Sequence, residues 1–240
     1  MRPFQYCHLS EVASHISQLS GIWMLEFAAQ VLPTVQIHGI DITSGLFPTS
    51  YPDNMQFTVH SVTSLPESWT SLYNFLHQRF LIGALAKSMW KSATMEMFRV
   101  LIKGGWIELV EMATESLFPG VGPHSTNIQL IISESATDKG LIKAPHIHIP
   151  ELLLEAGFVN IHTECRMAKI GRSGGEDGIY WISDWIRILE TIKMPILNAR
   201  GSGYVHSEEE YDAMVAGAKE EWLSCNAEFV CYTISAQKPT

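Results

Sequence analysis

The feature that most constrains the fold is the alternation of short β-like runs with amphipathic helical segments along the chain. The clearest case is residues 85–101, where apolar residues recur at every fourth position before a basic turn, two glycines and the β-like run 106–110. Further β-like runs occupy residues 35–40, 55–62, 72–76, 158–170 and 228–235. Such alternation is typical of a parallel sheet covered by helices. The sequence therefore predicts a doubly wound α/β fold.

The remaining segments suggest helices and one irregular stretch. Ser207 with Glu210 forms a capping box before an apolar face, which predicts a helix over 207–222. Residues 113–149 contain Gly, Pro, Ser and Thr in irregular order, and we interpret them as an insertion or lid over one end of the sheet. No repeat or linker divides the chain, so we predict a single domain over residues 1–240. Further helices are expected at residues 21–32, 150–156 and 179–192.

Composition narrows the range of partners. The chain of 240 residues carries 16 basic and 25 acidic side chains, and its net charge of −9 argues against a broad basic surface for nucleic acid. No apolar run reaches the roughly 18 residues that span a bilayer, and the start does not resemble a secretory signal. The four cysteines include no C-x-x-C pair. We therefore expect reduced thiols, a cytoplasmic or nuclear location, no direct nucleic-acid contact and no membrane span.

In a doubly wound sheet, ligands bind outside the carboxyl ends of the strands, so residues just after each strand are candidates. Asp41 closes the run 35–40, and the two oxygens of a carboxylate match the two hydroxyls of a ribose. The alternative is a loop aspartate that caps the next turn. Gly104 and Gly105 allow a sharp turn from helix into strand, which is a structural role. We expect these glycines and Asp41 to border a single crevice at one rim of the sheet.

Candidates for proton transfer follow two other strands. His77 and Arg79 lie two residues apart after the third run, so in an extended chain both point toward the cofactor mouth. Glu108 and Glu111 flank the end of the next strand, where one could act as a base or orient a substrate. We favour His77 as the proton acceptor and Glu111 as the second choice. The alternatives are a histidine at the core edge beside a surface arginine, and solvated carboxylates at a strand end.

Two further patterns carry no specific chemistry. His146 and His148 could offer two nitrogens to a metal ion, but no third ligand stands at a recognised spacing, so we predict no metal site. Residues 171–178 are rich in glycine but lack the Lys-Ser/Thr ending of a phosphate-binding loop. We interpret this segment as a flexible loop.

Several blocks of the sequence point together to a known family. They are residues 21–28, 39–43, 52–57, 77–80, 101–111, 153–158 and 207–211, and they cover most of the chain after residue 20. In this order they resemble the fungal LaeA-like group of methyltransferases that use S-adenosylmethionine (SAM). The resemblance implies a class I methyltransferase fold with a seven-stranded sheet, mostly parallel, whose last strand is antiparallel. It also implies that Asp41 binds the SAM ribose, with Gly21 and Ser61 as further cofactor contacts.

The chain departs from the pattern of this group near its start. Members usually have a strand that ends in Asp, followed by a G-x-G-x-G loop around the methionine part of SAM. Counting back from Gly21, His15, Ser17 and Leu19 stand where that Asp and the first two glycines would be. The acidic residue that usually meets the adenine is Ser61 here. Natural loss of SAM binding, an incomplete chain, or a shifted first strand with atypical contacts would each explain these differences.

Two functions therefore remain open. The first is a SAM-dependent methyltransferase that acts on a small molecule in fungal secondary metabolism, where an aromatic or polyketide-like substrate suits the composition. The second is a relative that has lost SAM binding and serves as an accessory, intermediate-binding or rearrangement-catalysing protein. A regulatory partner in a nuclear complex is a third possibility, without support from a basic patch. The first 20 residues predict a poor strand and a poor lid, and the apolar helix 179–192 could form a homodimer face, contact a pathway enzyme or complete the core.

Overall fold

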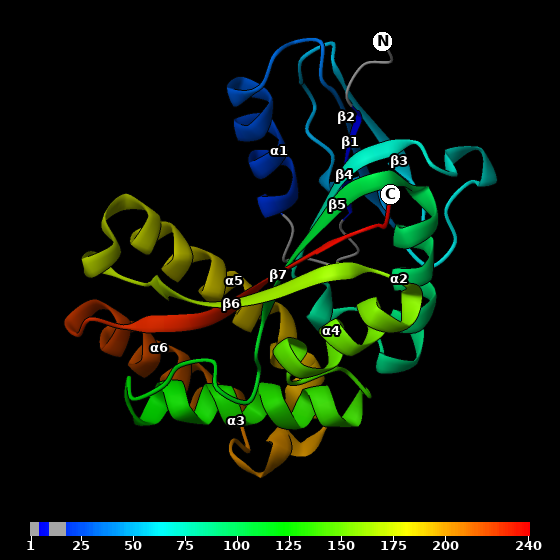
Figure 1. The fold of residues 1–240 in the computed structure, drawn as a ribbon. Coiled ribbons are helices and arrows are strands. Elements are labelled where there is room, and N and C mark those ends of the chain that lie inside the picture. Colours follow the sequence, from blue (N-terminus) through cyan, green and yellow to red (C-terminus); the bar gives the residue numbers. More distant parts are fainter. Residues whose placement is uncertain (1–4, 10–17) are drawn as a thin grey trace.

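The computed structural model describes residues 5–9 and 18–240, which form an open, twisted α/β sheet flanked by helices (Figure 1). The sheet has seven strands in the order β3-β2-β1-β4-β5-β7-β6. Strand β7 is antiparallel to both of its neighbours, whereas the other described pairs are parallel. The strands are β1 Gln5–Leu9, β2 Gln36–Asp41, β3 Met55–Val59, β4 Tyr73–Arg79, β5 Leu101–Met112, β6 Val159–Lys169 and β7 Glu228–Gln237.

The described residues form six α-helices. Five of them pack in two groups, and the sixth, α1, stands apart. Helices α2 and α4 pack on one face of the central strands, α1 lies beside β2, and α3, α5 and α6 gather around the start of β7 (Figure 1). They are α1 Gln18–Gln30, α2 Lys87–Val100, α3 Pro123–Asp138, α4 Pro145–Ala156, α5 Gly175–Asn198 and α6 Glu208–Ser224. Among these described helices, none has the length and hydropathy that a membrane span requires.

The buried apolar side chains follow these groups. The largest cluster joins the central strands to α2 and α4 around Trp90 and Phe158, both at most 1% exposed. A second cluster joins α3, α5 and α6 to β7 around Trp222 and Phe229. A third, smaller cluster fixes α1 on β2 and β3 through Met24. Most of the periodic apolar residues of helix α2 therefore face the core, as the helical spacing predicts, but Met89 is 41% exposed.

The expected α/β class is confirmed, and two local expectations are wrong. Residues 5–9, in the stretch expected to form a poor strand, make the interior strand β1, paired on both edges with β2 and β4. A strand between two parallel neighbours gains hydrogen bonds on both sides, so its own weak β propensity does not decide its conformation. The helix expected over 150–156 begins earlier, at Pro145, and the segment 113–149 interpreted as an insertion or lid also contains α3.

Candidate functional site

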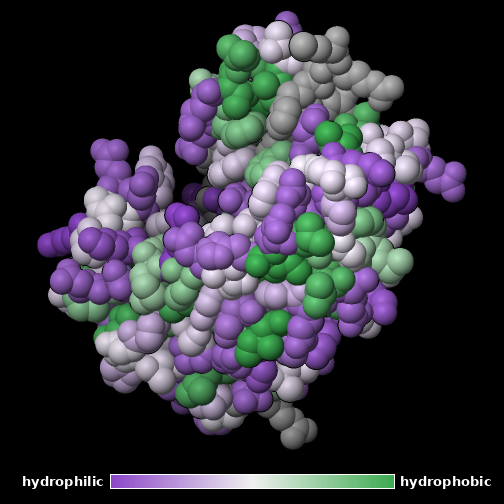
Figure 2. Space-filling view, in the orientation of Figure 1, coloured by the Kyte–Doolittle hydropathy of each residue, from purple (hydrophilic) through white to green (hydrophobic). Residues whose placement is uncertain are grey.

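The strands β2, β3, β4 and β5 run parallel, so their carboxyl ends meet at one edge of the sheet. This carboxyl edge carries Asp41 as the last residue of β2, Ser61 just after β3, Arg79 at the end of β4 and Glu111 near the end of β5. Four of the polar groups singled out in the sequence therefore do share one edge. Figure 2 shows that the surface is hollowed between α1 and the start of α5, on the side of this edge.

Asp41 lies at the point where a nucleoside-binding carboxylate is expected. Its side chain is 1% exposed, and Oδ1 accepts a hydrogen bond of 2.9 Å from the backbone N–H of Thr43. This bond orients the carboxylate at the end of β2. The turn also realises the capping role considered as the alternative, since the carboxylate accepts from the chain two residues on.

The other two expected cofactor contacts lie near the same edge. Ser61 Oγ accepts a 3.2 Å hydrogen bond from the N–H of Thr63 and lies 2.8 Å from its Oγ1. Gly21 is the fourth residue of α1 and lies near the amino end of this helix. Leu19 also lies in α1 rather than in a loop. His15 and Ser17, the other positions of the altered glycine motif, lie outside the described residues.

His77 lies inside the sheet rather than at its edge. It pairs with Glu108 in the β4–β5 ladder and is 2% exposed. Its ring stacks on Trp23 of α1, with centroids 3.9 Å apart and planes 5° from parallel. Burial lowers the pKa of His77, although its hydrogen bond and proximity to Glu108 oppose this shift. The ring is therefore neutral at pH 7, and Nδ1 donates to Glu108 Oε1 at 3.1 Å.

Glu111 is completely buried, and three donors surround its carboxyl group. Gln78 Nε2 donates to Oε1 at 2.6 Å, the N–H of Leu81 donates to Oε1 at 2.8 Å, and the N–H of Ile82 donates to Oε2 at 3.1 Å. Burial raises the pKa of Glu111 to about 8, and these three hydrogen bonds act in the opposite direction. The carboxyl group thus ties β5 to the loop after β4, in which Phe80 adopts a left-handed conformation.

Helix α5 approaches the carboxyl edge from the other side of the hollow. Asp184 is partly buried, and burial raises its pKa while Arg187 and Arg79 oppose the shift. The Arg79 guanidinium lies 5.2 Å from the ring centroid of Phe80, and that ring meets Trp181 of α5 edge to face. The start of α5 is therefore held over the end of β4 by both charge and aromatic contact.

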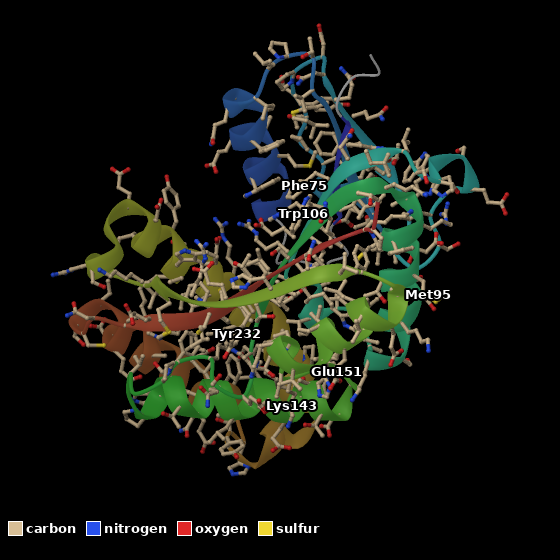
Figure 3. All side chains as sticks on the ribbon, in the orientation of Figure 1. Phe75, Met95, Trp106, Lys143, Glu151 and Tyr232 are labelled. Atoms are coloured by element: carbon tan, nitrogen blue, oxygen red, sulfur yellow. The ribbon has the colours of Figure 1, made fainter. Side chains whose placement is uncertain are left out.

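Gly104 and Gly105 do not border this site, so the predicted single crevice is wrong. Both glycines lie near the amino end of β5, because β5 begins at Leu101, five positions before the strand expected from the sequence. The register places Val110 of β5 beside the end of β4, so the glycines are roughly 17–20 Å away along the strand. They line a separate hollow of about 540 Å³ beside Phe75 and Trp106, both labelled in Figure 3.

The loss of this pair removes one argument for an enzymatic site. Asp41 and the two glycines cannot contact the same part of a ligand, and Gly104 instead adopts φ +74° where the chain enters β5. Its N–H donates to the carbonyl of Lys238 at 3.0 Å. The glycine pair therefore has the structural role. Any functional argument must rest on the carboxyl edge alone.

No metal centre is evident in the part of the chain that the structure describes, where no three His, Cys, Asp or Glu side chains cluster as ligands. The two histidines of the H-I-H pattern diverge on α4. His146 stacks on Tyr232 of β7 with centroids 4.3 Å apart, and His148 lies 3.6 Å from Glu151 one turn on.

Sequence reasoning missed one feature of this region. A small cavity lies beyond the ends of β4 and β5, between α3 and α5, and its lining includes Thr114 and Trp185. Trp185 has the spacing of an ordinary core residue on its helix, and Thr114 falls in the segment interpreted as an insertion. No local pattern distinguishes either residue, because the cavity is formed by elements far apart in the sequence.

The relatives found by comparison with known proteins and named here are fungal proteins called methyltransferases. No protein-family model matches the sequence. The chain is 27% identical over 216 residues to the methyltransferase grgD of a Penicillium species, across 84% of this chain and 73% of the relative. It is 24% identical over 226 residues to the N-methyltransferase tcpN of Claviceps purpurea, across 91% and 79% of the two chains.

Solved structures resemble the whole fold. Phosphoethanolamine N-methyltransferase 2 of Haemonchus contortus, solved with S-adenosylhomocysteine, matches 100% of this chain at a TM-score of 0.54 and 14% identity. The fold is that of SAM-dependent methyltransferases. The chain spans 50% of the length of that structure. The [4+2]-cyclase SpnF matches 99% of this chain and 76% of its own length, at a TM-score of 0.53 and 15% identity.

Proposed function

We propose that this protein is a SAM-dependent methyltransferase that acts on a small molecule in fungal secondary metabolism. The observation that carries the proposal is the position of Asp41, a buried and oriented carboxylate at the carboxyl end of β2, next to strand β1. In an open α/β sheet this is the edge at which nucleotide-like ligands bind. The similarity to fungal methyltransferases over most of the chain supports the same assignment.

The chemistry of the residues present fits this cofactor at three points. The Asp41 carboxylate would accept hydrogen bonds from the ribose hydroxyls, and Ser61 would lie beside the adenine. Gly21 would lie close to the methionine part, near the amino end of α1, where the helix dipole favours a negative group such as its carboxylate. When bound, SAM supplies a methyl group on a sulfonium that is already a good leaving group.

The role of this chain is then mainly to position the acceptor. His77 and Glu111 are the candidates for proton handling, and each is buried and hydrogen-bonded to other protein groups. We assign both a positioning role: His77 supports Trp23 and the start of α1, and Glu111 holds the loop that begins at Phe80. A nitrogen acceptor is favoured among oxygen, nitrogen and carbon, because the relative tcpN is named as an N-methyltransferase.

SAM binding tests the proposal directly. At a ligand concentration 100 times the dissociation constant, SAM or S-adenosylhomocysteine should stabilise the fold by about 2.7 kcal/mol. For a chain of this size that corresponds to a rise in Tm of roughly 5–10 °C. Differential scanning fluorimetry measures the rise, and isothermal titration calorimetry gives the dissociation constant. No shift with either ligand at millimolar concentration would remove the methyltransferase assignment.

Asp41→Asn should abolish most of this shift, because it keeps the shape of the side chain and removes the charged acceptor. The matched control is Asp53→Asn, an exposed aspartate on the same half of the sheet, which should leave the shift unchanged. If Asp41→Asn fails to fold, Ser61→Ala provides the second variant and should weaken binding to a smaller extent.

A second function is favoured by the burial of Asp41, which is 1% exposed. A relative that no longer binds SAM would also keep such a buried carboxylate, because it stabilises the turn after β2 by accepting from the N–H of Thr43. The [4+2]-cyclase SpnF shares this fold and is named for a reaction other than methyl transfer. This alternative predicts conversion or binding of a pathway intermediate in the absence of SAM, together with no thermal shift from SAM.

A further inference from the structure

The cavity between α3 and α5 has the character of a ligand site. Its volume is about 110 Å³, and it lies under the loops that follow β4 and β5. Most of its lining is apolar and comes from four separate segments, including Phe80, Ile82, Met112, Leu117, Ile132 and Ile188. An apolar cavity of roughly 150 Å³ in another protein holds benzene. The cavity here therefore fits a five-membered ring or a branched alkyl group.

Two residues of this lining, Trp185 and Thr114, each carry a buried polar atom that has no partner. Trp185 Nε1 and Thr114 Oγ1 are both buried, and neither makes a hydrogen bond to any group in the described part of the chain. The residues themselves are 3% and 9% exposed. Buried polar groups in folded proteins nearly always have a partner, so two such atoms on one cavity point to a ligand that supplies it.

The chemistry of these two atoms defines what the ligand must carry. An indole N–H is a donor only, and a threonine hydroxyl can donate or accept. One acceptor oxygen on the ligand can accept a hydrogen bond from the indole N–H and a second one from the threonine hydroxyl. A carbonyl oxygen has two lone pairs and can accept both hydrogen bonds, whereas a purely apolar ligand leaves both groups unsatisfied.

The cavity also has a route to solvent. Gly83 and Lys139 belong to its lining and are exposed, so the opening lies between the loop after β4 and the end of α3. A group attached to the ring can therefore extend outward. Helix α3 is fixed in place because Glu221 of α6 accepts hydrogen bonds from the backbone N–H groups of His124 and Ser125, at 2.9 and 2.8 Å.

We propose that this cavity binds the compact apolar end of a small molecule, a small ring or branched alkyl group that bears a carbonyl oxygen accepting from Trp185 Nε1. The site lies at the same edge of the sheet as Asp41, two to three strand spacings away, or roughly 10–14 Å. As the acceptor subsite of a methyltransferase it rests on the proposed function. Binding of the ring itself needs no SAM, so the two claims are tested separately.

The test follows the indole N–H signals of the protein labelled with ¹⁵N-tryptophan. Cyclopentanone is the probe, and methylenecyclopentane, which has the same shape without the acceptor oxygen, is the matched probe. We expect cyclopentanone to shift the Trp185 indole signal in a saturable way, with a dissociation constant on the order of 1 mM. Methylenecyclopentane has no acceptor for the indole N–H, so it should leave the position of that signal almost unchanged even where it binds.

Two variants make the test specific. Trp185→Phe removes the donor and should weaken cyclopentanone binding about three- to tenfold, with little effect on methylenecyclopentane. Trp222→Phe is the matched control, because Trp222 Nε1 is also buried without a partner among the described residues but Trp222 does not line the cavity. Ala136→Leu, which fills the cavity from α3, should abolish binding of both probes. It also serves if Trp185→Phe does not fold.

The proposal is overturned if cyclopentanone leaves the Trp185 signal unchanged at up to tens of millimolar, or if both probes move the indole N–H signal by the same amount. It is also overturned if Ala136→Leu binds cyclopentanone as the unmodified protein does. A protein that shows no thermal shift with SAM but binds cyclopentanone in this way would contradict the methyltransferase assignment and leave the cavity site intact. A protein that shows the thermal shift with SAM but does not bind cyclopentanone would contradict only the cavity site.

Discussion

Replacing Glu111 by alanine is expected to lower the free energy of unfolding by about 3–5 kcal/mol. The carboxyl group is 0% exposed and accepts from Gln78 and from two backbone N–H groups, so its removal leaves three buried donors without a partner. Urea denaturation followed by tryptophan fluorescence measures the change. Glu115→Ala, at an exposed position four residues on, is the control and should cost less than about 0.5 kcal/mol.

The same carboxyl group predicts a pH dependence with a definite sign. The unfolded chain loses this proton near pH 4.5, whereas burial raises the pKa in the folded protein to about 8. Between these values the folded state binds more protons, so the free energy of unfolding falls as pH rises from about 5 to about 8. Glu111→Gln cannot titrate, and its deficit relative to the unmodified protein should shrink over this window. A deficit that grows with pH would mean that the carboxyl group is ionised in the fold.

Gly178→Ala is expected to destabilise the protein by on the order of 3 kcal/mol, because the new Cβ would overlap the backbone carbonyl of Gly171. The two segments are also tied together, since the N–H of Gly171 donates to the carbonyl of Gly178 at 2.8 Å. A backbone atom cannot rotate away as a side chain can, so the start of α5 must move. The loss should appear as a lower urea midpoint without a change in the m-value.

The control for this substitution is Gly83→Ala. A Cβ at Gly83 would meet nothing within 4 Å, so the same chemical change should be nearly neutral there. If both substitutions changed the free energy of unfolding equally, the close contact between Gly178 and the carbonyl of Gly171 would not fix the position of α5. Since α5 carries Trp185, Gly178→Ala should also broaden or move the indole signal of Trp185.

The sequence predicted the carboxyl end of β2 correctly, but not the first strand of the sheet or the start of β5. Asp41 was correctly placed at the end of a strand, because β-branched residues mark the run before it and the direction of a parallel strand follows from the alternation with helices. The first strand was misjudged, because its stability comes from two neighbouring strands rather than from its own residues. Gly104 and Gly105 were misplaced because the true start of β5 depends on pairing with β4 and on the contact with Lys238.

The same division applies to the candidate chemistry. The sequence placed His77 and Glu111 near strand ends but carried no information on their burial, which depends on Trp23 of α1 and on the loop after β4. The glycine-rich segment 171–178 was interpreted as flexible, whereas three of its glycines, Gly171, Gly174 and Gly178, allow backbones to pass in close contact. Close approach of backbones leaves no local pattern, because the partner residue can be anywhere in the chain.

The α/β class, most of the elements and the carboxylate at the end of β2 could be predicted from the sequence, since hydrophobic periodicity and strand direction are local properties. The folded structure was needed to show that the glycine pair lies at the opposite edge, that Glu111 is enclosed by three donors, and that Thr114 and Trp185 line one cavity. Those features arise from strand register and from packing between distant segments. Both depend on long-range contacts that no window of the sequence contains.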